Sequence, residues 1–201
     1  MNVEFWDAQA ATFDDEPDHG LRDPRVREAW ARLLLPLMPK PNASVVDLGC
    51  GTGSLAVLLA EAGHHVRGLD FSAQMIEAAQ AKGAGLPVEF TTGDAACPPY
   101  PEASFDVVLA RHVLWALPDP AAAVERWVRL LRPDGVLLLV EGRWSTGAGL
   151  TSAEALKLVG RAATVTPLVD EALWGKQIDD ERYLLSNISN SGGPATPRDL
   201  P

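Results

Sequence analysis

Four residues at fixed spacing give the first sign of chemistry in the chain: Asp47, Gly49, Gly51 and Gly53. Val45 and Val46 precede them and an apolar, helix-forming run, residues 54–60, follows, which predicts a buried strand, a tight turn and a helix start. Glycine permits a left-handed backbone or the close approach of another group. The spacing differs from the dinucleotide and phosphate-loop patterns, and the Asp47 carboxylate would repel a pyrophosphate. The turn therefore favours a ligand with a cationic amino-acid end and no phosphate.

A second carboxylate, Asp70, ends the next predicted strand, residues 66–70. It follows the glycine turn by about twenty residues, the place where nucleotide-binding folds bond a ribose diol. Two carboxylate oxygens match two vicinal hydroxyl groups, although an ordinary turn residue at a strand end is the alternative. Phe71 and Met75 come directly afterwards and offer apolar surface to an adenine ring.

These residues together resemble motif I of the Rossmann-like (class I) methyltransferases that use S-adenosylmethionine (SAM), whose pattern is hydrophobic-D-x-G-x-G-x-G. The chain is similar in particular to small actinobacterial-type, small-molecule methyltransferases of the methyltransferase-11/25-like group. The resemblance covers roughly residues 3–190 and implies that the loop backbone lies against the methionine and ribose of SAM. It also implies that Asp94 accepts a hydrogen bond from the adenine amino group while the backbone N–H of Ala95 bonds the ring. On motif I alone, a glycine turn of an unrelated α/β protein is the alternative.

A further group of candidates follows the predicted fourth strand, where residues 104–115 run from a strand into a loop and short helix. Ligands of open α/β sheets sit outside the carboxyl ends of the strands, so Arg111, His112 and Trp115 should face the pocket. Arg111 is expected to contact SAM or an acidic substrate group. His112 is the first candidate for a general base because histidine titrates near neutrality, and His19 is the second. The alternative for both is an ordinary hydrogen-bonding or packing role.

The N-terminal segment is predicted to form a cap. One helical face carries Phe5, Trp6, Gln9, Ala10 and Phe13, and Pro17 and Gly20 should end the helix. The W-D-x-x-A-x-x-F-D pattern resembles the N-terminal cap of the small methyltransferases, which covers SAM and helps to form the substrate pocket. This implies a cofactor contact for Phe13 and substrate contacts for Trp6 and His19. Trp115, Trp144 and Trp174 could line an apolar pocket, although simple core packing is the alternative.

The remaining elements alternate in the order expected of an α/β protein. Strands are predicted at 88–90, 136–141, 163–169 and 181–188, and helices at 73–82, 121–131 and 151–163, with a turn at 132–135. The predicted fold is a Rossmann-like three-layer sandwich with a seven-stranded, mostly parallel sheet, an antiparallel pair at its edge and an N-terminal helical cap. Residues 1–190 are expected to form one SAM-binding methyltransferase domain, with the cap at 1–40, the core at 43–190 and a disordered tail at 191–201.

The composition of the chain limits the kinds of partner that it is expected to bind. The chain has 201 residues, 47% of them hydrophobic, and a formal net charge of -10, so no basic footprint for nucleic acid or anionic membrane is expected. Two cysteines make no disulfide framework and fit a cytoplasmic protein. Neither C-x-x-C nor H-E-x-x-H occurs, so no metal site is predicted. No signal peptide or membrane span is expected, and a monomer and a homodimer are both open.

The predicted function is methyl transfer from SAM to an O, N or C acceptor on a small molecule, with S-adenosylhomocysteine as product. The protein would act mainly by binding and alignment, with optional help from a general base. One alternative is a protein that binds SAM without transferring the methyl group. Another is a nicotinamide-dependent Rossmann oxidoreductase, which the glycine spacing disfavours.

Overall fold

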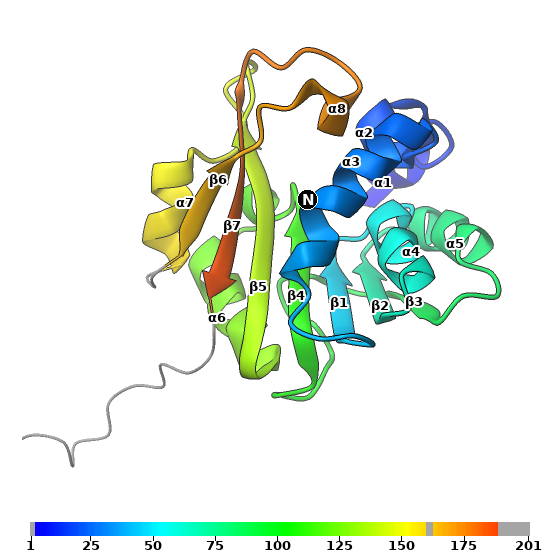
Figure 1. Cartoon of the computed structure of the whole chain (residues 1–201), viewed down its shortest axis with the longest axis vertical. Coiled ribbons are helices and arrows are strands. Elements are labelled where there is room, and N and C mark those ends of the chain that lie inside the picture. Colours follow the sequence, from blue (N-terminus) through cyan, green and yellow to red (C-terminus); the bar gives the residue numbers. More distant parts are fainter. Residues whose placement is uncertain (1–2, 160–162, 189–201) are drawn as a thin grey trace, which may run out of the picture.

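The computed structural model describes residues 3–159 and 163–188, which are built around a seven-stranded sheet (Figure 1). Its strands are β1 (Ser44–Leu48), β2 (His65–Asp70), β3 (Val88–Thr92), β4 (Phe105–Arg111), β5 (Leu131–Arg143), β6 (Thr164–Pro167) and β7 (Glu181–Ile188). The strand order is β3-β2-β1-β4-β5-β7-β6. Strands β1 to β5 pair in parallel, whereas β7 is antiparallel to both β5 and β6. The predicted mostly parallel sheet with an antiparallel pair at one edge is confirmed.

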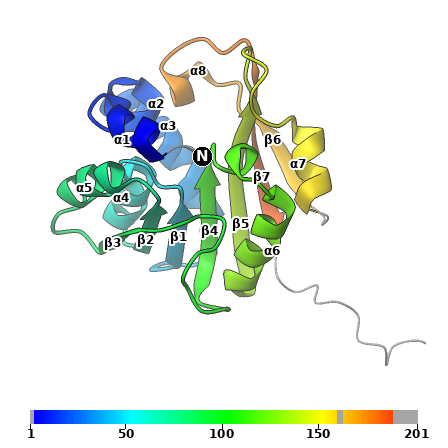
Figure 2. The same ribbon diagram turned by 180° about the vertical axis from the view of Figure 1, so that it is seen from behind.

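Helices cover both faces of this sheet, as Figures 1 and 2 show. They are α3 (Pro24–Leu34), α4 (Ser54–Glu61), α5 (Ala73–Lys82), α6 (Pro120–Leu130), α7 (Ser152–Val159) and α8 (Glu171–Trp174), with the short 3-10 helices η2 (Leu35–Leu37) and η3 (Leu114–Ala116). On one face Trp30 and Leu59 pack in a cluster with Val107 of β4. On the other face Trp127 packs in a cluster with Val108. Adjacent residues of β4 thus enter opposite cores, which is the three-layer arrangement expected of a buried parallel strand.

Local sequence signals explain where several helices begin. The side chains of Asp23, Ser72 and Asp119 each accept a hydrogen bond from a backbone N–H in the first turn of the following helix. Thr151 and Glu154 form a capping box at the start of α7, because each side chain accepts a hydrogen bond from the other residue's backbone N–H.

The N-terminal cap differs from the single helix that the apolar pattern predicts. Three short helices take its place: α1 (Val3–Gln9), the 3-10 helix η1 (Phe13–Asp15) and α2 (Pro17–Gly20). Pro17 begins α2 instead of ending a longer helix, since proline fits the first helical position, where no N–H is needed. Helix α1 buries none of its residues, and Phe5 is 54% exposed. The cap therefore depends on contacts with the core more than on its own helical face.

Two further boundaries differ from the sequence-based expectations. The predicted turn at 132–135 lies within β5, where Asp134 has a φ of 64° and the register with β4 shifts near Phe105. Ala163 precedes β6 and is not helical; residues 160–162, which the predicted helix would include, lie outside the described residues. The expected tail at 191–201 also lies outside the described residues.

Candidate functional site

A cavity of about 290 Å³ lies where the parallel strands end, between the core and the cap. Most of the residues singled out in the sequence line it together: Trp6, Phe13, His19, Gly49, Gly51, Asp70, Phe71, Met75, Asp94, Ala95, Arg111, His112, Trp115 and Trp144. A narrow hollow of about 50 Å³ shares Gly49, Gly51 and Arg111 with it and also contacts Asp47. Gly53 lines neither space. The carboxyl edge of the sheet thus forms the site, as expected for an open α/β fold.

The loop after β1 needs glycine for two different reasons. Gly49, Gly51 and Gly53 all have positive φ angles, of 72°, 54° and 77°. A Cβ on Gly49 would lie 2.3 Å from Val113 Cγ2, so this glycine lets the loop after β4 approach the cavity. A Cβ on Gly53 would lie 2.7 Å from Phe90 Cζ, and Gly53 caps α4. Its position is structural, so the geometry gives the predicted cofactor contact of Gly53 no support.

Asp47 lies at the end of β1 and is only 2% exposed. Burial raises the pKa of Asp47 to about 7, although nearby Arg111 and a hydrogen bond with the backbone of Ala56 favour the charged form. A cationic group placed beside this carboxyl would lower its pKa again and stabilise its charge. The position therefore suits the ammonium end of a ligand.

Asp70 lies at the end of β2, and both of its carboxylate oxygens accept hydrogen bonds from the backbone. Oδ2 accepts from the backbone N–H of Gly51 at 2.9 Å, and Oδ1 accepts from that of Ser72 at 2.9 Å. Burial raises the pKa of Asp70, and these backbone donors oppose that shift. Each oxygen has further lone-pair capacity, so the carboxylate can still accept from two hydroxyl groups in the cavity.

The far end of the cavity combines a carboxylate with apolar surface. Asp94 is exposed, and its Oδ1 accepts from the backbone N–H of Ala96 at 2.8 Å. Ala95 is 7% exposed, and its carbonyl accepts from the indole N–H of Trp127. Phe71 and Met75 complete this end, so an exposed carboxylate and apolar side chains meet there.

Arg111 and His112 follow one another at the end of β4 but have different environments. The Arg111 guanidinium donates to the backbone carbonyl of Asp18 and lies 5.2 Å from the ring centroid of Trp30. It thus ties α2 of the cap to the sheet. His112 has a φ of 60°, rare for a residue with a side chain. Its Nε2 atom is buried and has no hydrogen-bond partner among the described residues.

Burial lowers the pKa of His112 well below its usual range, and the neighbouring Arg111 and Arg182 lower it further. Burial also lowers the pKa of His19, with the charge of Arg111 acting in the same direction. Both imidazoles are therefore neutral at pH 7. A neutral imidazole has one nitrogen able to accept a proton or a hydrogen bond.

Aromatic rings form the rest of the wall. The His112 and Trp144 ring centroids lie 5.1 Å apart, and Trp144 packs edge-on against Trp115 at 5.3 Å. On the cap, Phe13 stacks on His19 at 4.2 Å, and Trp6 meets Phe13 edge-on at 6.2 Å.

Trp174, a further candidate for this wall, does not line the cavity. It is 1% exposed and packs behind His112 at 5.8 Å. Its indole N–H donates to the carbonyl of Leu168, so the side chain is core, as the alternative interpretation had it.

Sequence reasoning missed Glu141, a fully buried carboxyl on β5. Its Oε1 accepts from the backbone N–H groups of Val113 and Leu114, at 3.0 and 2.7 Å. Glu141 thereby holds the loop that carries His112 and Trp115. The sequence does carry a signal for this residue, because a charged side chain directly follows the apolar run 136–140.

The Glu141→Gln variant should change how stability depends on pH. Burial raises the pKa of Glu141 to about 8, from a reference value of 4.5. The stability this protonated carboxyl contributes is complete below pH 4.5 and is lost as the pH rises through 8. Glutamine keeps an acceptor oxygen and does not titrate. Between pH 5 and pH 9 the unfolding free energy of the wild type should therefore fall relative to the variant by at least ~1.4 kcal/mol, the equivalent of one pKa unit.

Urea unfolding at the two pH values measures this difference. Because Asp47 and the other titrating groups are present in both proteins, their contributions cancel in the comparison. Parallel pH profiles for the two proteins would contradict the assignment of a protonated Glu141.

A second hollow, of about 490 Å³, lies at the opposite, amino ends of the strands. Two of its cationic residues, Arg67 and Arg132, are paired with Glu89 and Asp106. Within the part of the chain that the structure describes, no group of three His, Cys, Asp or Glu residues could hold a metal ion. No helix among those residues is long and apolar enough to cross a membrane.

Part of the chain matches a known protein family. Residues 46–139 match the family described as "Methyltransferase domain". Nocamycin O-methyltransferase of Saccharothrix syringae is 42% identical over 112 residues, which cover 52% of this chain and 40% of that protein. The 27-O-demethylrifamycin SV methyltransferase of Amycolatopsis mediterranei is 32% identical over 174 residues, covering 83% of this chain and 61% of that protein. The chain thus matches less than two thirds of the length of either relative.

A solved structure shows the same fold. The S-adenosylmethionine dependent methyltransferase from Mesorhizobium loti superposes with a TM-score of 0.65, covering 80% of this chain and 96% of that one at 20% identity. Residues 46–139 therefore match this methyltransferase family in sequence, and the chain shares its Rossmann-like fold with that solved structure.

Proposed function

We propose that the chain transfers a methyl group from SAM to a hydroxyl group of a small molecule. The observation that carries this proposal is the convergence of the glycine loop, Asp70 and Asp94 on one cavity at the carboxyl edge of the sheet. The names of the two relatives, nocamycin O-methyltransferase and 27-O-demethylrifamycin SV methyltransferase, support a small-molecule acceptor.

The residues that line the cavity and the narrow hollow beside it fit SAM. Asp47 would face the cationic amino-acid end, the ribose hydroxyls would lie at Asp70, and the adenine would lie between Met75 and the Asp94–Ala95 corner. The loop N–H groups of Gly49 and Cys50 donate to the carbonyl of Leu69, so they are not free to bind a phosphate. When bound, SAM supplies an activated methyl group on a sulfonium.

The acceptor side of the cavity favours an uncharged, planar molecule. Its walls are Trp6, Trp115 and Trp144, together with the two neutral imidazoles. Arg111 is occupied by the Asp18 carbonyl and the Trp30 ring, so it offers little to an acceptor carboxylate. Aromatic walls exclude water and hold a flat ring at low entropic cost, which aligns the acceptor oxygen for attack.

We assign to His112 the role of accepting the proton of the acceptor hydroxyl. As the acceptor oxygen bonds the methyl carbon and the carbon–sulfur bond breaks, the hydroxyl proton must leave. The neutral imidazole of His112 can accept that proton or hold it in a hydrogen bond during transfer. Its lowered pKa keeps it unprotonated at neutral pH but makes it a weak base, so alignment supplies most of the rate.

Calorimetric titration with SAM, S-adenosylhomocysteine and NAD tests the cofactor. We expect a Kd on the order of 1–100 μM for the first two ligands and none measurable for NAD. Folded protein that binds neither adenosyl compound would overturn the proposal. Incubation with methyl-labelled SAM and a panel of phenols and alcohols then separates transfer from binding alone.

A further inference from the structure

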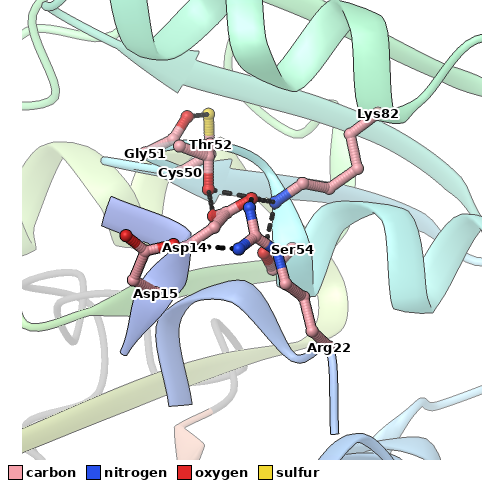
Figure 3. A network of polar contacts seen from close by, with 8 residues as sticks. All are labelled: Asp14, Asp15, Arg22, Cys50, Gly51, Thr52, Ser54 and Lys82. Carbon is pink, nitrogen blue, oxygen red and sulfur yellow. Dashed lines mark hydrogen bonds and ion pairs between the residues drawn. The ribbon is translucent and has the colours of Figure 1, made fainter. Parts of the chain in front are cut away.

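Four polar side chains, those of Asp14, Thr52, Ser54 and Lys82, form a cluster that joins the cap to the glycine loop (Figure 3). None of these four residues lines the cavity. The centre of the cluster is Lys82, the last residue of α5. The Lys82 Nζ atom lies 2.7 Å from Asp14 Oδ2 on η1, 3.1 Å from Thr52 Oγ1 on the loop, and 2.7 Å from Ser54 Oγ at the start of α4. The three ammonium hydrogens can therefore each find an acceptor, and each acceptor belongs to a different segment.

Asp14 is bound from two sides in the same cluster. Its Oδ1 accepts from the Thr52 hydroxyl at 2.5 Å, while its Oδ2 faces the Lys82 ammonium. The side chains of Asp14 and Lys82 are only 15% and 24% exposed. Because little water competes here, the loss of one partner leaves the other charge poorly compensated.

Other ion pairs of the cap are far more open to water. Arg22 and Asp15 pair at 2.9 Å with side chains 65% and 64% exposed. Lys176 and Glu16 pair at 2.9 Å with side chains 54% and 55% exposed. Exposed pairs of this kind contribute little to stability. The Lys82–Asp14 pair is thus the most shielded of these three ion pairs.

The cluster lies directly beside residues of the cavity wall. Phe13 precedes Asp14 in the chain and lines the cavity, and Gly51 precedes Thr52 and does the same. Phe13 and Gly51 lie in close contact, because a Cβ on Gly51 would lie 3.2 Å from Phe13 Cε1. On both segments, one residue faces the cavity and the next is bound in the cluster.

We propose that Lys82 is a positioning residue that, through Asp14, holds Phe13 of the cap against the glycine loop and so slows the departure of SAM and its product. This inference rests on the proposed function. Lys82 does not touch the cavity, so it acts on the residence time of the cofactor and not on the methyl transfer itself.

Stopped-flow measurement of S-adenosylhomocysteine dissociation tests the inference. Lys82→Met removes the ammonium group and keeps the length of the side chain. We expect its dissociation rate constant to rise about tenfold or more, while the association rate constant changes less than about threefold. Asp14→Asn should raise the dissociation rate constant to a similar extent. The double variant should dissociate no faster than the more severe single variant, because both substitutions remove the same Lys82–Asp14 interaction.

Arg22→Ala is the matched control, since Arg22 also approaches Asp14, at 3.9 Å, but with a 65% exposed side chain. Its dissociation rate should stay within about twofold of the wild type. Unchanged dissociation in folded Lys82→Met or folded Asp14→Asn would overturn the inference.

Hydrogen exchange separates this inference from the proposed function. In the protein without ligand, Lys82→Met should speed exchange in residues 13–20 and leave β1 and β4 unchanged. If the wild type binds no adenosyl compound, the proposed function fails, and exchange alone decides whether Lys82 holds the cap. Equal exchange in residues 13–20 would overturn the positioning role.

Discussion

Asp70→Ala is expected to weaken SAM binding by roughly 100-fold, or about 2.7 kcal/mol. The carboxylate lies in the cavity with free lone pairs, and a hydrogen bond to a charged group contributes about 1.5–3 kcal/mol. The same substitution removes the acceptor for the backbone N–H of Gly51 and loosens the glycine loop. Calorimetry with SAM and S-adenosylhomocysteine measures the loss.

Two further variants make this result specific. Asp70→Asn keeps one acceptor oxygen and should lose less affinity than Asp70→Ala. Glu89→Ala removes a carboxylate from neighbouring β3 that is paired with Arg67 at the surface, and it should leave SAM affinity unchanged. If folded Asp70→Ala bound SAM as tightly as the wild type, the ribose assignment would be wrong.

The sequence was most informative where structure and site depend on local signals. The positive φ angles after β1 require glycine, and strand-ending Asp70 follows at a fixed distance, so spacing alone led to both. The helix at 73–82 was predictable for the same reason, because its cap, Ser72, lies only a few positions from the backbone N–H that it binds.

Long-range contacts could not be predicted in this way. The apolar spacing of residues 3–20 suggested one helix, but contacts with the core divide the segment, including the one between Asp14 and Lys82, which are 68 positions apart. A lysine at the end of a helix is common and gives no hint of such a partner. Gly53 shows the converse: it matches the motif, yet its neighbour in space is Phe90.

The His112→Asn variant is expected to lower kcat by about 100-fold or more for a hydroxyl acceptor, since general-base catalysis typically contributes about 10²–10⁴. Asparagine tolerates the left-handed backbone found at this position, so the loop should keep its course. SAM affinity should stay within about threefold of the wild type, because the loss falls on proton transfer and not on uniform binding. His65→Asn, at an exposed histidine on the amino end of β2, is the control and should retain full activity.

The acidity of the acceptor decides whether His112 handles the proton or only shapes the pocket. A series of substituted phenols of similar size can be assayed with both proteins at constant pH. If His112 removes the proton, its loss should matter less as the phenol becomes more acidic, because such acceptors already ionise in water. A purely steric role would lower kcat by the same factor across the series.

The lowered pKa of His112 adds a second check. Because the imidazole is neutral well below pH 6.5, the wild type should show no loss of kcat from protonation of His112 between pH 8 and pH 6.5.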